Sequence, residues 1–310
     1  MHIDGYIVLA GAVVGFAVGL TGMGGGALMT PVLVLLLHVQ PGAAVSSDLV
    51  ASFIMKPVGG AVHLRRRTVH LRLAAWLVVG AAPAAFAGAA LLNALAKGPT
   101  LQSDVKLGLG AALLLAVVGL AVRALTAKRS AAAGPADDDQ LPRVRPVSTL
   151  IVGIVGGAIV GMTSVGSGSL MIVALMFLYP RLTGAQLVGT DLVQSVPLVG
   201  AAALGQLLFG HVVLAVTVSL LIGSLPAVYL GARFSSIAPT SFTRPAIAVV
   251  LLASAVKLVG GSNALLIEVL VAATVVVSAA PLWRVLRTRR AQLGAGTVEA
   301  RPVTADARAS

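Results

Sequence analysis

Long apolar segments without charged side chains recur along this chain of 310 residues and limit what it can fold into. Hydrophobic residues make up 58% of the sequence and charged residues only 10%, whereas a soluble domain has about 25% charged residues. A helix needs roughly 17–25 apolar residues to cross a bilayer. The sequence therefore predicts an all-α polytopic membrane protein surrounded by membrane lipid.

Glycine, proline and polar breaks divide the apolar sequence into nine segments. They lie at 5–38, 44–63, 69–93, 104–126, 147–180, 185–208, 211–232, 242–260 and 264–287. We group them as a first membrane repeat (1–127), a cytoplasmic linker (128–146), a second membrane repeat (147–263), an extra C-terminal transmembrane helix (264–288) and a disordered cytoplasmic tail (289–310). The first and fifth segments are long, and glycines interrupt both.

The two halves resemble each other at a nearly constant offset. "GLTGMGGGALM" at Gly19 aligns with "GMTSVGSGSLM" at Gly161, 142 residues later. After a one-residue insertion "SDLVAS" recurs as "TDLVQS", and a third block with glycine and proline recurs further on, as Gly80, Pro83 and Gly88 and then as Gly223, Pro226 and Gly231. An offset preserved over three separate blocks indicates an internal duplication.

Basic residues lie mainly in short clusters between the apolar segments, for example from Arg65 to Arg72 and from Arg284 to Arg290. The positive-inside bias places these clusters in the cytoplasm, with the N-terminus outside and the C-terminus inside. Segments 5–38 and 147–180 then enter the membrane from opposite faces and turn back within it. We expect two inverted repeats, each a broken re-entrant helical hairpin plus three transmembrane helices. This arrangement accounts for the net charge of +12 without nucleic acid as a partner.

The glycine-rich breaks inside the two hairpins are predicted to meet and line one anion site near the middle of the membrane. A backbone that leaves its helix in a bilayer persists only where protein or a water-filled cavity satisfies its polar groups. Transporters with inverted repeats bind substrate where such broken helices meet. The candidate residues are Thr21, Gly22, Gly24, Gly25 and Gly26 in the first break and Thr163, Ser164, Gly166, Ser167 and Gly168 in the second.

Close helix packing is the alternative explanation for these small residues. We favour it for Gly11, Gly15 and Gly19, which precede the first break. Hydroxyl groups in helices also often bond to their own backbone.

Polar side chains follow each hairpin in the next helix, as Asp48, Ser52 and Lys56 in the first half and as Asp191, Gln194 and Ser195 in the second. Those of the first half are spaced four apart and share one helical face. Lys56 either neutralises a bound anion, pairs with Asp48 or extends to the membrane surface. For both acids we favour a structural role near a helix start, with proton coupling as the alternative.

The segments "GLTGMGGGALMTPVLVLL", "AVSSDLVASF" and "GAAPAAFAGA", with degenerate copies in the second half, resemble the TauE/SafE family of sulfite exporters and related permeases. The resemblance covers nearly the whole chain apart from the linker and tail. The family's signature positions correspond to Gly22, Gly24, Gly25, Gly26, Pro31, Gly166 and Gly168. The second block departs from the family pattern, because it reads "SVGSGS" and has no proline at Val173.

This resemblance implies a secondary transporter in the bacterial inner membrane that moves sulfur-containing anions such as sulfite, sulfonates or sulfoacetate, usually outward. Import of the same anions, or transport of another small organic anion such as a carboxylate, remain alternatives. A homodimer is compatible with the sequence, but nothing in it requires one.

An enzyme is the less favoured class. "GSGS" resembles the serine turn of intramembrane proteases, but His211, the candidate base, falls in a loop on the other side of the membrane. The chain has no cysteine and no recognisable metal-ligand or phosphate-binding motif. We therefore expect neither catalysis nor a cofactor nor a metal.

Overall fold

The computed structural model describes residues 3–21, 25–95, 101–132, 144–210, 212–234 and 240–262, together with 264–265, 267–269 and 271. The chain divides into two units, Met1–Leu266 and Ile267–Ser310. The extra helix predicted over 264–288 and the tail predicted over 289–310 lie almost wholly outside the described residues. The fold described below is that of the first unit.

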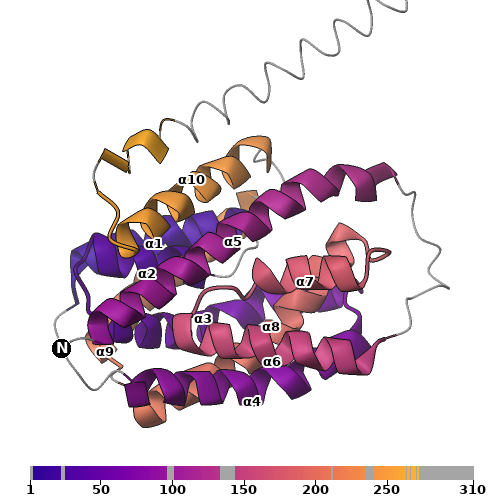
Figure 1. Ribbon diagram of the computed structural model, residues 1–310, viewed down its shortest axis with the longest axis horizontal. Coiled ribbons are helices and arrows are strands. Elements are labelled where there is room, and N and C mark those ends of the chain that lie inside the picture. Colours follow the sequence, from indigo (N-terminus) through magenta and orange to yellow (C-terminus); the bar gives the residue numbers. More distant parts are fainter. Residues whose placement is uncertain are drawn as a thin grey trace, which may run out of the picture. The chain divides into compact units, whose positions relative to one another are not determined.

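Ten helices are described in the first unit (Figure 1). Those of the first half are α1 (Gly5–Thr21), α2 (Gly26–Leu35), α3 (Pro41–Arg65), α4 (Leu71–Leu95) and α5 (Leu101–Ala132). Those of the second half are α6 (Pro146–Thr163), α7 (Leu170–Leu178), α8 (Gly184–Phe209), α9 (Leu214–Phe234) and α10 (Thr240–Leu258). α5 continues past Lys128, where the predicted linker begins.

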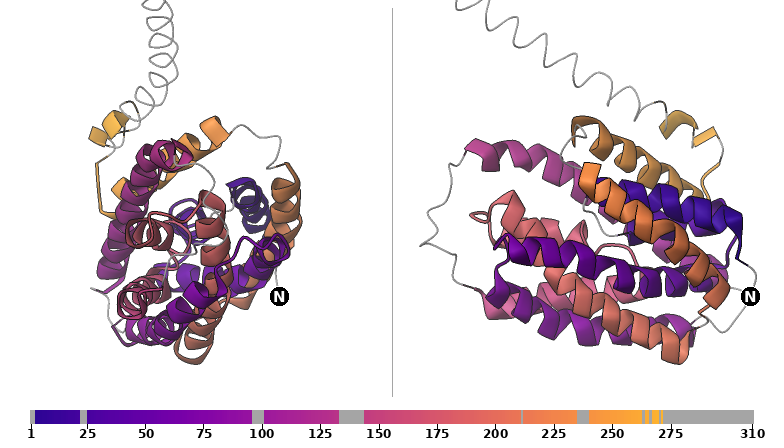
Figure 2. Two further views of the ribbon diagram at one scale, coloured as in Figure 1. Left: turned by 90° about the vertical axis from the view of Figure 1, so that its right-hand side faces the viewer. Right: turned by 180° about the vertical axis from the view of Figure 1, so that it is seen from behind.

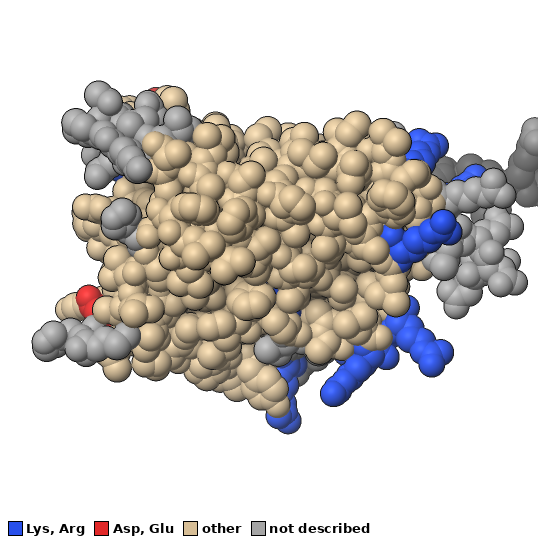
Figure 3. Space-filling view, turned by 90° about the horizontal axis from the view of Figure 1, so that it is seen from below, with Lys and Arg blue, Asp and Glu red and all other residues tan. Residues whose placement is uncertain are grey.

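Five of the described helices are long and apolar enough to cross a membrane, which confirms the predicted all-α polytopic class. These spans are Leu71–Ala94, Val105–Val122, Pro146–Thr163, Gly184–Phe209 and Leu214–Gly231. Large apolar side chains such as Val79, Val118 and Leu207 are more than half exposed, as expected of a surface facing lipid. Figure 3 shows a broad uncharged band on one face, with Lys and Arg gathered at one end of it.

The second interrupted segment forms a helix, a break and a shorter helix that returns, whereas in the first segment α1 and α2 flank residues 22–24, which lie outside the described residues. In the second half, the Thr149 hydroxyl near the start of α6 lies 2.6 Å from the Tyr179 hydroxyl just after α7, and the Arg145 N–H also donates to Tyr179. The start of α6 and the end of α7 are therefore adjacent. Residues 164–169 form the break, and Gly25 closes the first break at the start of α2.

Glycine contacts between helices occur twice, at positions related by the repeat. A Cβ at Gly15 of α1 would lie 2.8 Å from the Ser224 backbone of α9, and a Cβ at Gly157 of α6 would overlap the Ala81 backbone of α4. Gly157 is the counterpart of Gly15, and Ser224 is the counterpart of Ala81. Two further contacts between α1 and α9, Gly11 with Leu220 and Gly223 with Val8, have counterparts between α6 and α4. These counterparts are Gly153 with Leu77 and Gly80 with Leu150. α1–α9 and α4–α6 are therefore equivalent close pairs (Figure 1, Figure 2).

This packing agrees with the close-packing interpretation of Gly11 and Gly15, because backbones approach where side chains are absent. Both glycines face the backbone of α9. Gly19 lies near the same helix, since a Cβ at Gly231 would be 3.1 Å from its Cα.

α3 and its repeat counterpart α8 run in opposite directions. The Ser46 hydroxyl at the start of α3 donates to Gln206 Oε1 near the end of α8, at 2.7 Å. Towards the end of α3, a Cβ at Gly60 would lie 3.8 Å from the Leu192 carbonyl near the start of α8. Antiparallel counterparts are what an inverted repeat requires; the membrane orientation of the repeats stays a prediction.

Contacts between helix ends place several arginine-bearing loops together, at what we call the basic end. The His70 N–H before α4 donates to Thr190 near the start of α8, at 3.0 Å, and α4 runs parallel to α6. α3 and α9 also end here, because short links join α3 to α4 and α8 to α9. Exposed arginines of these loops are Arg65, Arg66, Arg67, Arg72, Arg145, Arg181 and Arg233.

We expect Gly157→Ala to destabilise the protein, because its new methyl group overlaps the α4 backbone, which cannot move without separating two helices. Overpacking of this kind costs about 1–3 kcal/mol. Thermal unfolding in detergent measures the effect. Gly108→Ala is the matched control, since nothing lies within 4 Å of a Cβ there. An equal effect of both changes would contradict the tight α4–α6 contact.

Candidate functional site

The second break owes its shape to three residues with positive φ. Ser164 has φ 59°, Gly166 has φ 112° and Gly168 has φ 113°. Glycine adopts such angles without strain, whereas a serine there is strained unless its surroundings hold it. The Ser169, Leu170 and Met171 N–H groups at the start of α7 all donate to the Gly166 carbonyl. These N–H groups at the start of α7 are therefore not free to bind an anion.

The two breaks touch each other. A Cβ at Gly26, the first residue of α2, would overlap the Ser164 carbonyl of the second break. A Cβ at Gly25 would instead meet α3, 3.3 Å from Met55 Cε and 3.6 Å from Ser52 Oγ. The first hairpin thus packs against both the second break and the polar face of α3.

Asp48 of α3 joins these elements through its carboxylate. Oδ2 accepts from the Thr30 hydroxyl of α2 at 2.7 Å and from the Ser164 hydroxyl at 2.8 Å. Oδ1 accepts from Ser52, one turn further along α3, at 3.2 Å. Asp48 is fully buried, and hydrogen bonds to a charged group are stronger than those between neutral groups. The bond to Asp48 holds the strained Ser164 in place.

Lys56 lies two turns further along the same face of α3. Its ammonium group donates a hydrogen bond to the Ser167 hydroxyl of the second break. Lys56 is only 7% exposed, and it interacts electrostatically with Asp191 of α8 and, less strongly, with Asp48. The interpretation in which Lys56 extends to the membrane surface is therefore wrong. Its charge is held at the break.

The polar residues of α8 form a second, smaller group. The Gln194 amide donates to Asp191 Oδ1 at 2.9 Å, and both side chains are buried. Gln194 Oε1 has no hydrogen-bond partner among the described residues. Asp191 is linked to the first group through its interaction with Lys56.

The structure thus brings Gly25, Gly26, Asp48, Ser52, Lys56, Ser164 and Ser167 together. The Thr163 hydroxyl instead donates to Ile159 at 2.6 Å and that of Ser195 to Leu192 at 2.9 Å, both within their own helices. These two hydroxyl groups therefore bond to the backbone of their own helices, as the alternative explanation for hydroxyl groups in helices predicted. Thr21 ends α1, and Gly22 and Gly24 lie outside the described residues.

Sequence reasoning missed Thr30, and it named Ser169 only as one of the hydroxyl donors at the second break. Thr30 comes directly after the glycine-rich motif, and its hydroxyl group donates to Asp48. The sequence signal that could have identified Thr30 is its position just before Pro31, which is buried inside α2. The Ser169 hydroxyl is buried at the second break and has no partner among the described residues. It adds a hydrogen-bond donor beside Ser167.

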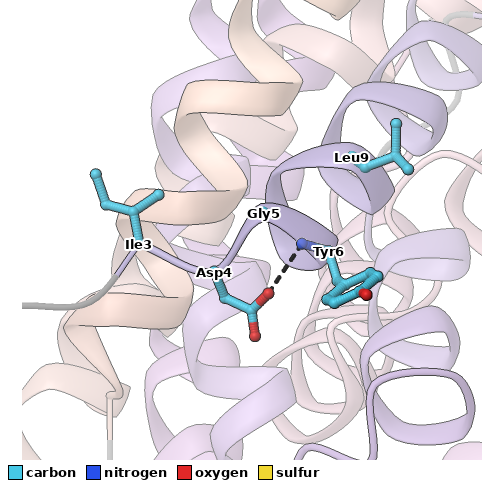
Figure 4. A pocket seen from close by; sticks show the side chains of 5 residues that line it. All are labelled: Ile3, Asp4, Gly5, Tyr6 and Leu9. Atoms are coloured by element: carbon cyan, nitrogen blue, oxygen red, sulfur yellow. Dashed lines mark hydrogen bonds between the residues drawn. The ribbon is translucent and has the colours of Figure 1, made fainter.

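A separate hollow of about 580 Å³ lies at the start of α1 (Figure 4). Ile3, Asp4, Gly5, Tyr6 and Leu9 line it, and all of them are exposed. Asp4 accepts a hydrogen bond from the Tyr6 N–H at 2.9 Å. An exposed apolar hollow whose charged group is a carboxylate does not suit an anion, so we place the candidate site at the buried breaks.

The arrangement at the breaks offers one ammonium group and several hydroxyl donors in a buried environment. Such groups bind a small oxyanion by charge and hydrogen bonds. Within the described part of the chain, no group of three or more histidine or acidic side chains suits a metal ion.

We expect Gly26→Ala to separate the two breaks, because its methyl group would overlap the Ser164 backbone. A cysteine introduced at the fully buried Val165 should then react faster with a maleimide, which is readable because the chain has no native cysteine. Gly25→Ala is the control, since its methyl group meets the flexible end of Met55. Equal labelling in both backgrounds would contradict the contact between the breaks.

Comparisons with known proteins agree with this architecture. The family model described as "Sulfite exporter TauE/SafE" matches residues 7–258. The chain is 35% identical over 258 residues to the "probable membrane transporter protein" YjnA of Bacillus subtilis strain 168, covering 82% of this chain and 98% of that protein. It is 26% identical over 255 residues to the "probable membrane transporter protein" YdhB of the same strain, covering 79% and 98%.

No solved structure matches the chain. The family match includes both hairpins, both breaks and all ten described helices of the first unit apart from the first residues of α1. The chain therefore belongs to the TauE/SafE family of sulfite exporters, as its motifs suggested, and is a multi-pass membrane transporter.

Proposed function

We propose that this protein exports small sulfur-containing anions, such as sulfite, a sulfonate or sulfoacetate, across the bacterial inner membrane. The observation that carries the proposal is the buried Lys56 ammonium group, held against Ser167 where the two broken helices meet. The family match supports the class of substrate.

Electrostatics favours an anion at this place. An ammonium group away from water interacts strongly with a nearby negative charge, because the surrounding dielectric constant is low. The hydroxyl groups of Ser167 and Ser169 add donors without adding charge. A tetrahedral or pyramidal oxyanion presents several acceptor oxygens, so it can bond the ammonium group and these hydroxyls together.

The pairing of helices from opposite halves supports an alternating-access mechanism. α1 contacts α9 extensively and α6 contacts α4 equally closely, so each hairpin is attached to the opposite half of the chain. Rocking of one such pair against the other would open the breaks to one side and then to the other. α3, whose residues contact both breaks, lies where the two pairs meet.

The basic end is the cytoplasmic end in this proposal, because short cytoplasmic loops are rich in arginine. Gly5 lies at the opposite end and Gly184 at the basic end, and nothing is within 4 Å of a Cβ at either position.

Single cysteines at these two glycines test the orientation. In intact cells, an impermeant maleimide should label Gly5→Cys and should label Gly184→Cys only after permeabilisation. The reverse pattern, or labelling of both from outside, would overturn the proposed orientation.

Flux measurements in liposomes test the substrate and the role of Lys56. We expect sulfite, sulfoacetate or taurine to exchange faster than a carboxylate such as acetate. Lys56→Met should weaken apparent affinity by roughly 10- to 100-fold, the worth of a hydrogen bond to a charged group. Lys106→Met, at an exposed lysine of α5, is the control.

Unchanged affinity in Lys56→Met would remove Lys56 from the site. Faster exchange of a carboxylate than of any sulfur anion would identify a different organic-anion permease. Efflux and uptake measured in right-side-out and inside-out vesicles decide between export and import.

A further inference from the structure

We propose that Asp48 is the proton-binding group of this transporter, so that one proton binds with each transported anion. The inference rests on the proposed anion transport at the same breaks. It assigns the buried carboxyl that joins the two hairpins to a task beyond holding them together.

The count of buried charges leaves one negative charge in excess. Lys56 is a single cation that interacts with two buried carboxyl groups, Asp48 and Asp191, and its interaction with Asp191 is the larger. A buried carboxylate without a full counter-charge is costly in a low-dielectric environment. An anion bound at Lys56 adds a second excess negative charge, and one proton on one of the two acids offsets it.

Among the described side chains of the elements around Asp48, no second cation lies at the site. The sequences of α2, the second break and α6 have no titratable side chain. α8 supplies Asp191, already counted. The charged and titratable groups that are described on α5 and α9 are Lys106, Tyr229 and Arg233, and all three are exposed.

Hydrogen bonds leave room for one proton on Asp48 itself. A carboxylate has about four acceptor positions, two on each oxygen. Among the described residues, Oδ2 accepts two hydroxyl bonds and Oδ1 accepts one, which leaves one position on Oδ1 without a described partner. A proton can bind at this position while Thr30, Ser52 and Ser164 keep their hydrogen bonds to Asp48.

Asp48 and Asp191 differ in their partners. Asp48 is bonded to three hydroxyl groups, and a hydroxyl group can donate to a carboxylate or accept from a protonated carboxyl. Asp191 accepts the Gln194 amide and has the stronger interaction with Lys56.

Anion binding and proton binding then support each other. An anion bound to Lys56 offsets the attraction that this ammonium group exerts on Asp48. The free energy of the ionised Asp48 therefore rises, which favours protonation of Asp48. By linkage, a proton on Asp48 raises the affinity for the anion by the same factor. Because a proton neutralises a monovalent anion, the combined movement carries no net charge, and its direction follows the two concentration gradients.

The experiment uses the full-length protein in liposomes with sulfoacetate, once the flux panel shows that it is exchanged. Sulfoacetate is a dianion, so one proton per anion leaves one net negative charge moving, and valinomycin with equal potassium on both sides holds the membrane potential at zero. For the wild type we expect a pH gradient to drive uphill accumulation, about one proton recorded per anion by an internal pH dye, and apparent affinity that falls by up to about tenfold per pH unit as pH rises. Asp48→Asn, a neutral mimic of the protonated group, should lose proton-driven accumulation and the pH dependence of the anion exchange that it retains.

Asp191→Asn is the matched control and should retain accumulation driven by the pH gradient. Proton-free flux in the wild type, or undiminished accumulation in Asp48→Asn, overturns the inference while leaving anion transport intact. If the wild type exchanges no sulfur anion, both proposals fail together. If Asp48→Asn does not assemble, Asp48→Glu is measured instead: it should retain coupling with a displaced pH profile, and an unchanged profile overturns the assignment.

Discussion

The hydrogen bonds that Asp48 accepts are the interactions on which the centre of this structure depends. A chain that leaves its helix inside a membrane must satisfy its polar groups within the protein. At the second break Ser164 adopts a left-handed conformation, and its hydroxyl is bonded to Asp48. The same carboxylate accepts from Thr30 of the first hairpin. One buried acid therefore fixes the distance between two hairpins that are far apart in sequence.

The internal duplication supplies the scaffold twice but the polar site only once. Glycine contacts between α1 and α9 recur between α6 and α4 at matching positions. Asp48 and Ser52 recur as Asp191 and Ser195, but the counterparts of Lys56, Ser164 and Ser167 are Val199, Gly22 and Gly25. Helix packing tolerates only small residues at its closest contacts, so both copies kept their glycines. Polar side chains were free to diverge.

Sequence patterns predicted the two breaks, their repeat and the shared face of Asp48, Ser52 and Lys56, since these depend on local spacing and on membrane length. They did not predict Thr30 as a partner of Asp48, because that contact joins α2 to α3 and depends on how two helices cross. Sequence spacing also could not show that the Ser164 hydroxyl bonds to Asp48 whereas the Thr163 hydroxyl bonds to its own helix. That difference arises from the left-handed turn at a single residue.

The asymmetry between the breaks assigns them different tasks. The second break provides hydroxyl groups to the two buried charged residues of α3, whereas the described part of the first break provides glycine surfaces. Gly26 has no side chain where Ser164 approaches, so the first hairpin closes against the second without offering a ligand of its own there. Asp48 is bonded to Thr30 of the first hairpin and to Ser164 of the second, so a separation of the two hairpins breaks at least one of these bonds. The carboxyl group is therefore placed where its charge and the contact between the two hairpins affect each other directly.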